Sequence, residues 1–306
     1  MIKVENLIKY FGRVKAVDDI SFEVKQGEVV GFLGPNGAGK TTTMRMLSGF
    51  LSADGGKISF GGKLIEDDII KAQKQIGYLP ENNPLYKDML VSEFLELSAE
   101  LNNIPKEKKT GAFDFAVSST GIKEIFYRPI KELSKGFKQR VGIAAAILHK
   151  PSIIMMDEPT EGLDPNQRAE IRSLIRKLSK DHTIIISTHV MQEASAVCDR
   201  MLIINKGKII ADGTTDELSR TGENEQSIFL DVEGDGVEQA LQNVAGIKRV
   251  EIKNTEGNRI QAEIIADNSV KIQPDISRLI GERHWVVWKL SEKERELEDI
   301  FRSLTK

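Results

Sequence analysis

The sequence predicts an α/β fold built on a parallel sheet, followed by a smaller α+β unit. Two short segments, Ile153–Met156 and Thr183–Ser187, are continuously apolar, which is typical of strands buried on both faces of a parallel sheet. A helical pattern over Gln167–Ser179 separates them, and the order strand, helix, strand indicates a right-handed crossover. A chain of 306 residues also favours about two domains.

The first domain, residues 1–219, begins with short β-rich segments separated by turns. We expect strands over Ile2–Leu7, Ala16–Val24 and Val29–Leu33, and a helix that begins at Lys40. A small hairpin follows over residues 58–65. From about residue 92 to residue 146 the apolar residues recur with helical spacing.

The second domain, residues 227–306, follows a polar, glycine-containing segment at residues 220–226 that we interpret as a linker. A charged helix over Glu292–Leu304 is expected to close the chain. Between linker and closing helix the pattern is strand, helix, strand, strand, helix, strand, the ferredoxin-like order of an accessory domain. The expected elements are Ile228–Val232, Gly236–Val244, Val250–Lys253, Ile260–Ile265, Val270–Ile280 and Trp285–Leu290.

Composition excludes several classes of protein. The 43 Lys and Arg nearly balance the 46 Asp and Glu, a net charge of −3, so a protein built to coat nucleic acid is disfavoured and no nucleic-acid partner is expected. The one cysteine, Cys198, excludes an internal disulfide, suits a reducing compartment and is expected in the core. No apolar run approaches the roughly 18 residues of a membrane span, and the first residues lack a signal-peptide pattern. We therefore expect a cytoplasmic chain.

A phosphate-binding loop lies directly after the strand Val29–Leu33. Residues 34–41 match G-x-x-x-x-G-K-[ST] in full and precede a helix, as this motif requires. Glycines let backbone N–H groups approach phosphate oxygens, and the helix N-terminus attracts the same anion. Lys40 is assigned to the β- and γ-phosphates and Thr41 to Mg²⁺. The predicted nucleotide-binding residues are Gly34, Asn36, Gly37, Ala38, Gly39, Lys40, Thr41 and Thr42.

Two adjacent acids follow the buried strand Ile153–Met156. Asp157 and Glu158 stand at the carboxyl end of that strand, where open α/β sheets bind ligands. Consecutive side chains of a strand point in different directions, so the two carboxylates need different roles. We assign Asp157 to Mg²⁺ and Glu158 to the activation of the attacking water, with Lys40 as the other catalytic side chain beside the phosphates.

These motifs, together with three further segments, resemble one family, the ATP-binding subunits of ABC transporters. The further segments are Leu133–Arg140, Glu161–Asp164 and Ser187–His189, and Leu133–Arg140 is similar to the family's signature sequence. The resemblance covers roughly the first 215 residues. It implies a P-loop NTPase cassette with a RecA-like parallel sheet, a small antiparallel β subdomain and a helical signature subdomain, with ATP and Mg²⁺ as cofactors.

The resemblance also implies a dimer. In the family, the signature sequence acts on the ATP held by a second copy of the cassette, in a head-to-tail sandwich. The matching residues here are Ser134, Lys135 and Gly136, while Asp164 would help to shape the interface between the copies. The family's usual signature is Leu-Ser-Gly-Gly-Gln, whereas this chain has Lys135 in place of the first glycine and Phe137 in place of the glutamine.

Three more residues receive roles through the same resemblance. Phe11 occupies the position of the aromatic residue that stacks on adenine, and it is favoured over Tyr10. His189 matches the histidine that senses the γ-phosphate, so we include it among the catalytic residues. Glu81 stands where the family has a glutamine that bridges Mg²⁺ and the membrane subunit, so it keeps an oxygen ligand but adds a negative charge.

The implied function is ATP hydrolysis that drives a separate integral membrane permease, with this chain peripheral at the inner face of the cell membrane. The departures at residues 81 and 135 resemble the branch that serves ABC-2-type exporters, and within it the ATPase associated with bacterial gliding motility. An alternative is a soluble ABC ATPase of DNA repair or translation. The chain lacks the long coiled-coil insertion of the repair enzymes and the paired cassettes of the translation factors. A kinase or GTPase would share the phosphate loop but not Leu133–Arg140.

Overall fold

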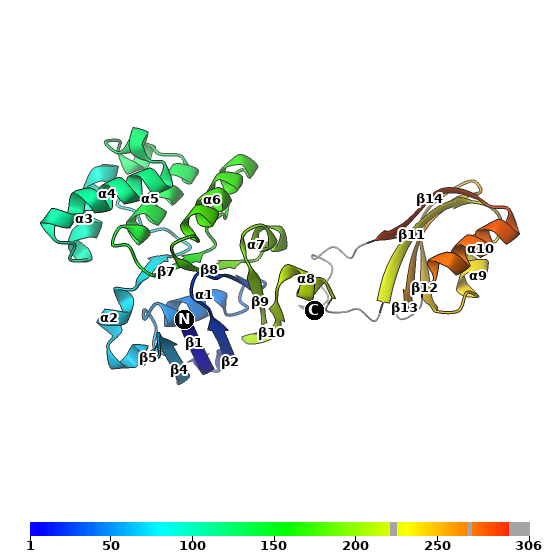
Figure 1. Ribbon diagram of the computed structural model, residues 1–306, viewed down its shortest axis with the longest axis horizontal. Coiled ribbons are helices and arrows are strands. Elements are labelled where there is room, and N and C mark those ends of the chain that lie inside the picture. Colours follow the sequence, from blue (N-terminus) through cyan, green and yellow to red (C-terminus); the bar gives the residue numbers. More distant parts are fainter. Residues whose placement is uncertain (221–224, 268–270, 294–306) are drawn as a thin grey trace. The chain divides into compact units, whose positions relative to one another are not determined.

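The structure is a computed structural model that describes residues 1–220, 225–267 and 271–293. The chain divides into two compact units, one over Met1–Thr215 and one that begins at Asp216 (Figure 1). Most of the expected closing helix, Glu292–Leu304, lies outside the described residues. Within the predicted linker of 220–226, the helix α8 (Thr215–Arg220) ends at residue 220 and the strand β11 begins at Glu225.

A six-stranded sheet forms the centre of the first unit. Its strand order is β10-β9-β3-β8-β7-β6, and every neighbouring pair is parallel except β9 with β10. The predicted strands over Val29–Leu33, Ile153–Met156 and Thr183–Ser187 are confirmed as β3, β7 and β8. All three are buried along their whole length, as their apolar sequences indicated. The bounds are β3 Val29–Leu33, β6 Ile76–Leu79, β7 Ile153–Asp157, β8 Thr183–Thr188, β9 Arg200–Asn205 and β10 Lys208–Gly213. Because these strands are parallel, the carboxyl ends of β3, β7 and β8 meet at one edge of the sheet.

Helices surround this sheet, and three of them gather at one end of the unit (Figure 1). These three are α3 (Val91–Leu101), α4 (Lys106–Thr120) and α5 (Lys135–Ile147), in the region whose apolar spacing predicted helix. The remaining helices of the unit are α1 Lys40–Leu47, α2 Ile69–Gln73, α6 Pro165–Leu178 and α7 Met191–Val197.

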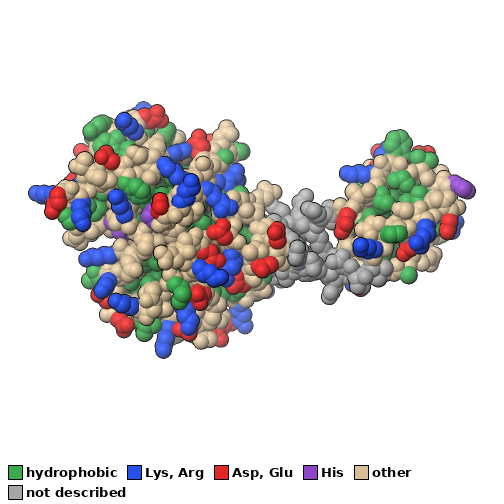
Figure 2. Space-filling view, viewed as in Figure 1, with side chains coloured by type: hydrophobic (Ala, Val, Ile, Leu, Met, Phe, Trp, Pro, Cys, Tyr) green, Lys and Arg blue, Asp and Glu red, His purple; other side chains and the backbone are tan. Residues whose placement is uncertain are grey.

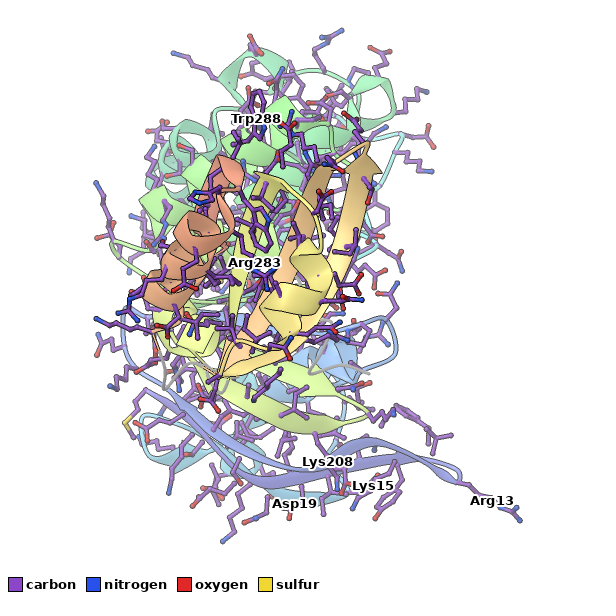
Figure 3. All side chains as sticks on the ribbon, turned by 90° about the vertical axis from the view of Figure 1, so that its right-hand side faces the viewer. Arg13, Lys15, Asp19, Lys208, Arg283 and Trp288 are labelled. Carbon is purple, nitrogen blue, oxygen red and sulfur yellow. The ribbon has the colours of Figure 1, made fainter. Side chains whose placement is uncertain are left out.

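A second, antiparallel sheet of order β2-β1-β4-β5 packs on the first. Its strands are β1 Ile2–Phe11, β2 Val14–Val24, β4 Gly55–Phe60 and β5 Lys63–Leu64. The predicted first strand was too short, since β1 pairs with β2 as far as Phe11 opposite Val14. Register shifts between Val4 and Tyr10 interrupt the alternation that would have revealed these residues as strand. Arg13 lies at the tip of this hairpin (Figure 3).

Beyond α8, the described part of the second unit contains a four-stranded antiparallel sheet and two helices. The sheet order is β12-β13-β11-β14. The elements are β11 Glu225–Glu233, α9 Val237–Gln242, β12 Ile247–Glu256, β13 Arg259–Asp267, α10 Gln273–Arg283 and β14 Val286–Lys293. The core of this unit joins one sheet face to both helices and includes Ile228, Leu230, Ile264 and Trp285. Helix α10 begins later than predicted because Pro274 occupies its first turn.

Among the described residues, no helix has the length and apolar character needed to cross a membrane. Cys198 is buried as predicted, at the end of α7. Its thiol lies 2.7 Å from the position that a Cβ at residue 31 would occupy, so Gly31 on β3 cannot be replaced without displacing it. Burial raises the pKa of the Cys198 thiol, which keeps it protonated.

Candidate nucleotide-binding site

The phosphate loop connects β3 to α1 and is tightly packed. Gly37 and Gly39 have φ values of +79° and +108°, in the region that favours glycine. A Cβ at Gly39 would lie 2.5 Å from the carbonyl oxygen of Ala16, so the start of β2 also supports the loop. The first N–H groups of α1 have no partner within the helix, and no side chain caps them. Phosphate binding by these N–H groups stays a prediction of the motif, with which the glycine conformations are compatible.

Lys40, the first residue of α1, has a side chain that is nearly buried. Its Nζ donates to the carbonyl oxygen of Gly34 at 2.7 Å and lies 3.4 Å from Glu158 Oε1. A cation is therefore held between the phosphate loop and the carboxylate at the end of β7. This position suits a lysine that binds phosphate oxygens while it lies close to the proposed base.

Asp157 and Glu158 lie at the end of β7 in different surroundings, as predicted. Asp157 is fully buried, and the hydroxyl of Ser187 on β8 donates to its Oδ1. Its Oδ2 has no hydrogen-bond partner, and neither has Glu158 Oε1. Buried carboxylate oxygens without a donor are costly and rare in proteins. Asp157 Oδ2 therefore has unused capacity to hold a cation or a water molecule, whereas Glu158 Oε1 faces the Lys40 ammonium at 3.4 Å.

Glu158 has an unusual backbone. Its φ of +48° lies in the left-handed region, which costs a residue other than glycine about 1 to 2 kcal/mol. The chain turns sharply there, and the side chain comes to lie against both Lys40 and His189. His189 Nδ1 is 3.0 Å from Glu158 Oε2. Strained backbone of this kind is concentrated at functional sites.

A cavity of 260 Å³ collects most of the predicted residues. The phosphate loop and α1 form one wall, and Glu81, Glu158 and His189 contribute from other segments. Sequence reasoning gave no role to two further lining residues, Ala16 and Glu161. Glu161 belongs to a segment that carried the family resemblance, and its N–H donates to the carbonyl oxygen of Glu158 at 3.1 Å. That short turn was the available signal, because it returns residue 161 towards the acid pair.

Glu81 follows the end of β6 and lies among other acids. Burial raises the pKa of Glu81, and the negative charges of Asp157, Glu161 and Glu158 raise it further, while Lys40 lowers it. Removing a proton from this cluster concentrates negative charge beside the phosphate loop. Such a concentration attracts a divalent cation.

The predicted signature residues lie apart from this cavity. Ser134 caps α5, accepting a hydrogen bond from the N–H of Phe137 at 3.3 Å. Ser134 and Lys135 are exposed, Gly136 packs against Gln167, and none of the three lines the cavity. Asp164 is also outside the cavity and caps α6 by accepting from the N–H of Gln167 at 2.9 Å. The structure gives these residues helix-capping or packing roles within the chain and leaves Ser134 and Lys135 accessible.

Phe11, at the end of β1, is 52% exposed and does not line the cavity. It belongs to the same hairpin as Ala16, which does. Adenine stacking by Phe11 therefore stays a prediction. The Nζ of Lys9 lies 5.9 Å from the centre of the Phe11 ring.

The donor set fits Mg²⁺ bound together with phosphate. The described residues contain no group of three or more His, Cys, Asp or Glu side chains arranged to hold a metal ion. Mg²⁺ commonly needs only one or two protein oxygens, since phosphate and water supply the rest. The Thr41 hydroxyl at the cavity is one such oxygen, and Asp157 Oδ2, which is unpartnered but belongs to a fully buried residue that does not itself line the cavity, is another.

The sequence and the fold of this chain are similar to those of known ATP-binding proteins. Residues 17–161 match the ABC transporter family. An uncharacterised ABC transporter ATP-binding protein of Methanocaldococcus jannaschii is 41% identical over 72% of this chain and 79% of its own length. The linearmycin resistance ATP-binding protein LnrL of Bacillus subtilis is 34% identical over 100% of this chain and 98% of its own. The solved structure of CbiO1 from Clostridium perfringens, part of the ABC transporter complex CbiONQ, is 31% identical, with a TM-score of 0.65 over 72% of this chain and 93% of its own.

The two curated relatives share sequence with this chain, the solved structure also shares the fold of the first unit, and the chain spans most of the length of each. Other cassettes of similar fold have been solved as nucleotide complexes, one of them after hydrolysis with ADP and phosphate bound. The chain belongs to the family of ABC transporter ATP-binding proteins, and it is an ATPase that uses Mg-ATP.

Proposed function

We propose that this chain is the ATP-hydrolysing subunit of an ABC-2-type exporter and drives a separate membrane permease. The cavity carries the proposal, because it joins the phosphate loop to Glu158 and His189 in one place. Export is supported by the full-length similarity to a resistance protein, which includes the second unit. The acidic residue at position 81 and the lysine at position 135 add to this support.

Each side chain of the site receives a task from its position. Lys40 and the N–H groups of the loop bind the phosphates, and Glu158 accepts a proton from the attacking water. His189, whose Nδ1 faces Glu158 Oε2 in the structure, is assigned to donate its ring N–H to a γ-phosphate oxygen when ATP is bound. Asp157, Thr41 and, through its oxygen, Glu81 would hold Mg²⁺. When bound, Mg²⁺ neutralises charge on the phosphate oxygens.

A second copy of the subunit completes the site. Ser134, Lys135 and Gly136 lie at the start of the 13-residue helix α5, and the first two are exposed outside their own cavity. A hydroxyl, a cation and a helix N-terminus together suit the phosphates of an ATP held by the partner. Asp164 lies at the same interface. The closed dimer then holds two Mg-ATP.

The test of this dimer uses Glu158→Gln, which keeps the shape of the side chain but removes its basicity. With Mg-ATP, the variant is expected to elute as a dimer in size-exclusion chromatography, because ATP persists between the two copies. Adding Ser134→Arg to the same chain is expected to restore the monomer. A Glu158→Gln chain that stays monomeric at saturating ATP would contradict the sandwich arrangement.

The permease is proposed to bind a groove of 370 Å³ beside the site. The groove lies between the segment after α1 and the helices α3 and α5, and its rim carries Phe50 and Leu101, which are 70% and 72% exposed. Pro80 lines this groove and the next residue, Glu81, lines the nucleotide cavity. A partner in the groove would therefore contact the chain next to the γ-phosphate end of the site.

This contact is tested by co-purification with the permease. Phe50→Glu is expected to release the permease while the isolated subunit keeps its ATPase activity. Tyr127→Glu, at a side chain that is 77% exposed elsewhere in the first unit, is the matched control and is expected to leave the complex intact. Equal retention by both variants would place the permease elsewhere.

We propose residues 1–219 as the cassette, 220–226 as the linker and 227–306 as an accessory domain of the dimer. The order βαββαβ and the strand order β12-β13-β11-β14 support a ferredoxin-like arrangement for the accessory domain.

Attachment to the permease would place the chain at the inner face of the membrane. Basic and acidic side chains are interspersed over the visible face of the first unit (Figure 2), and this mixed charge argues against a nucleic-acid partner. Gliding motility gains no support from the relatives and forms no part of the proposal.

A further inference from the structure

We infer that Ser187 is a positioning residue for ATP hydrolysis, which orients Asp157 and Glu158 together through a single hydroxyl. The inference rests on the proposed roles of these two acids. Ser187 belongs to the segment Ser187–His189, of which only the histidine has so far received a role. Its tertiary contacts, which the sequence does not reveal, supply the reason.

Ser187 lies in β8, directly opposite Asp157 in the parallel pairing of β7 with β8. Both residues are fully buried, so their polar atoms have no access to solvent. The Ser187 hydroxyl donates to Asp157 Oδ1. A hydroxyl has one proton to donate, and this contact uses it.

The consequence for Asp157 is a fixed carboxylate plane. Because Oδ1 is held by Ser187, Oδ2 is the oxygen left without a hydrogen-bond partner. Residues that bond to the far oxygen of a metal-binding carboxylate commonly set its orientation and tune metal affinity. Ser187 would thus direct the free oxygen of Asp157 towards the cation, without touching the cation itself.

The same hydroxyl also accepts a hydrogen bond from the backbone of Glu158. The Glu158 N–H lies 3.0 Å from Ser187 Oγ and 3.2 Å from the Ser187 carbonyl oxygen. Glu158 has its φ of +48° at this point, and its side chain turns to Lys40 at 3.4 Å and His189 at 3.0 Å. The hydrogen bonds that Ser187 accepts from the Glu158 N–H therefore support the turn that orients the proposed base.

The neighbouring hydroxyl shows that this arrangement is specific to Ser187. Thr188 is equally buried, but its hydroxyl accepts from the N–H of Val190 and supports only the turn after β8. Thr183, at the other end of β8, accepts from the N–H of Gly27 at 3.0 Å. Within β8, the described hydroxyl that contacts both acids is that of Ser187.

The test compares Ser187→Ala with Thr183→Val, which removes a buried hydroxyl from the same strand far from the acids. In the full chain carrying Glu158→Gln, calorimetry measures the affinity for ATP in EDTA and for Mg-ATP. Ser187→Ala is expected to leave the affinity for metal-free ATP unchanged and to lower the gain in affinity from Mg²⁺ about tenfold. Thr183→Val is expected to change neither, and Ser187→Thr, which keeps the hydroxyl, should preserve the gain.

A second readout uses the chain with Glu158 intact. The Mg²⁺ concentration that half-saturates ATPase activity is expected to rise in Ser187→Ala and not in Thr183→Val. Equal Mg²⁺ dependence of these two variants would overturn the inference. Asp157→Asn distinguishes the role of Ser187 from the metal site on which that role depends. If it raises the Mg²⁺ requirement while Ser187→Ala does not, only the role of Ser187 fails, and if neither raises it, the proposed metal site fails as well.

Discussion

Two buried aspartates, one in each unit, differ in how completely their carboxylate oxygens are hydrogen-bonded. Asp157 at the end of β7 is 0% exposed, and Asp231 on β11 is 5% exposed. Asp157 has one oxygen bonded to Ser187 and one without a partner. Asp231 is fully bonded, with Arg259 Nε at 2.7 Å, Arg259 Nη2 at 2.8 Å and Gln261 Nε2 at 2.9 Å.

The charges around the two aspartates also differ. Arg259 forms a two-point ion pair with Asp231, and its guanidinium lies 4.3 Å from the ring centre of Trp288. Trp288 is exposed at the end of the second unit (Figure 3). In the first unit the single lysine at position 40 lies beside a cluster of carboxylates. A fully hydrogen-bonded acid needs no ligand, whereas a partly bonded buried acid is stabilised by one. This difference separates an acid with a structural role from a candidate binding residue.

The largest effect is expected for Glu158→Gln. Loss of the base should reduce ATP turnover by about 10²- to 10⁴-fold, while the affinity for ATP is retained. Steady-state phosphate release measures the turnover. Glu170→Gln, at an exposed carboxylate paired with Arg140, is the control and should keep normal turnover. Comparable losses in both variants would remove the distinction between a binding acid and a structural one.

Lys40→Ala should weaken binding itself. The lysine supplies a charge-assisted contact to phosphate, so its loss is expected to lower ATP affinity by about 10- to 100-fold, the equivalent of about 1.5 to 3 kcal/mol. Calorimetric titration with ATP checks this, with Lys63→Ala on β5 as the exposed control. Unchanged affinity would show that the cation serves Glu158 alone.

Phe11→Ala should have a smaller effect. An aromatic stack contributes about 0.5 to 1.5 kcal/mol, so the KM for ATP is expected to rise about 2- to 10-fold with little change in kcat. Tyr10→Ala on the same strand is the matched control, since the neighbouring ring should not contact the base. If Tyr10→Ala has the larger effect, adenine stacks on the other side of the hairpin.

Asp231→Asn should leave ATP hydrolysis unchanged and weaken only the second unit. The Arg259 guanidinium holds the pKa of Asp231 below its usual value. The stabilisation by this ion pair is therefore fully present above the ordinary pKa of about 3.9 and is lost as the pH falls through the lower, folded pKa. The wild-type unit should resist mild acid better than Asp231→Asn, measured by circular dichroism from neutral pH downwards. Asp275→Asn, at a half-exposed acid on α10 that pairs with Arg278, is the control. A loss of ATPase activity in Asp231→Asn would link the two units functionally.

The sequence by itself determined the phosphate loop, the acid pair and the buried strands that carry them. Each of these is a local pattern: glycine spacing fixes a turn, an uninterrupted apolar run fixes a doubly buried strand, and the motif places Lys40 at a helix start. The order of elements also sufficed to anticipate the sheet-and-helix composition of the second unit, although Pro274 moved the start of α10.

Tertiary structure decided which side chains meet. Parallel pairing sets Ser187 opposite Asp157, a turn returns Glu161 to the cavity, and the left-handed conformation of Glu158 points its side chain at Lys40. The pairing of Ser187 with Asp157 joins residues 30 positions apart, and the direction of the Glu158 side chain depends on a backbone angle that residue type alone does not favour. Hydrogen-bond satisfaction likewise belongs to the folded chain. Asp157 and Asp231 are the same residue type in the sequence. Only their hydrogen-bond partners in the folded chain make Asp157 a candidate metal ligand and Asp231 a residue that stabilises the second unit.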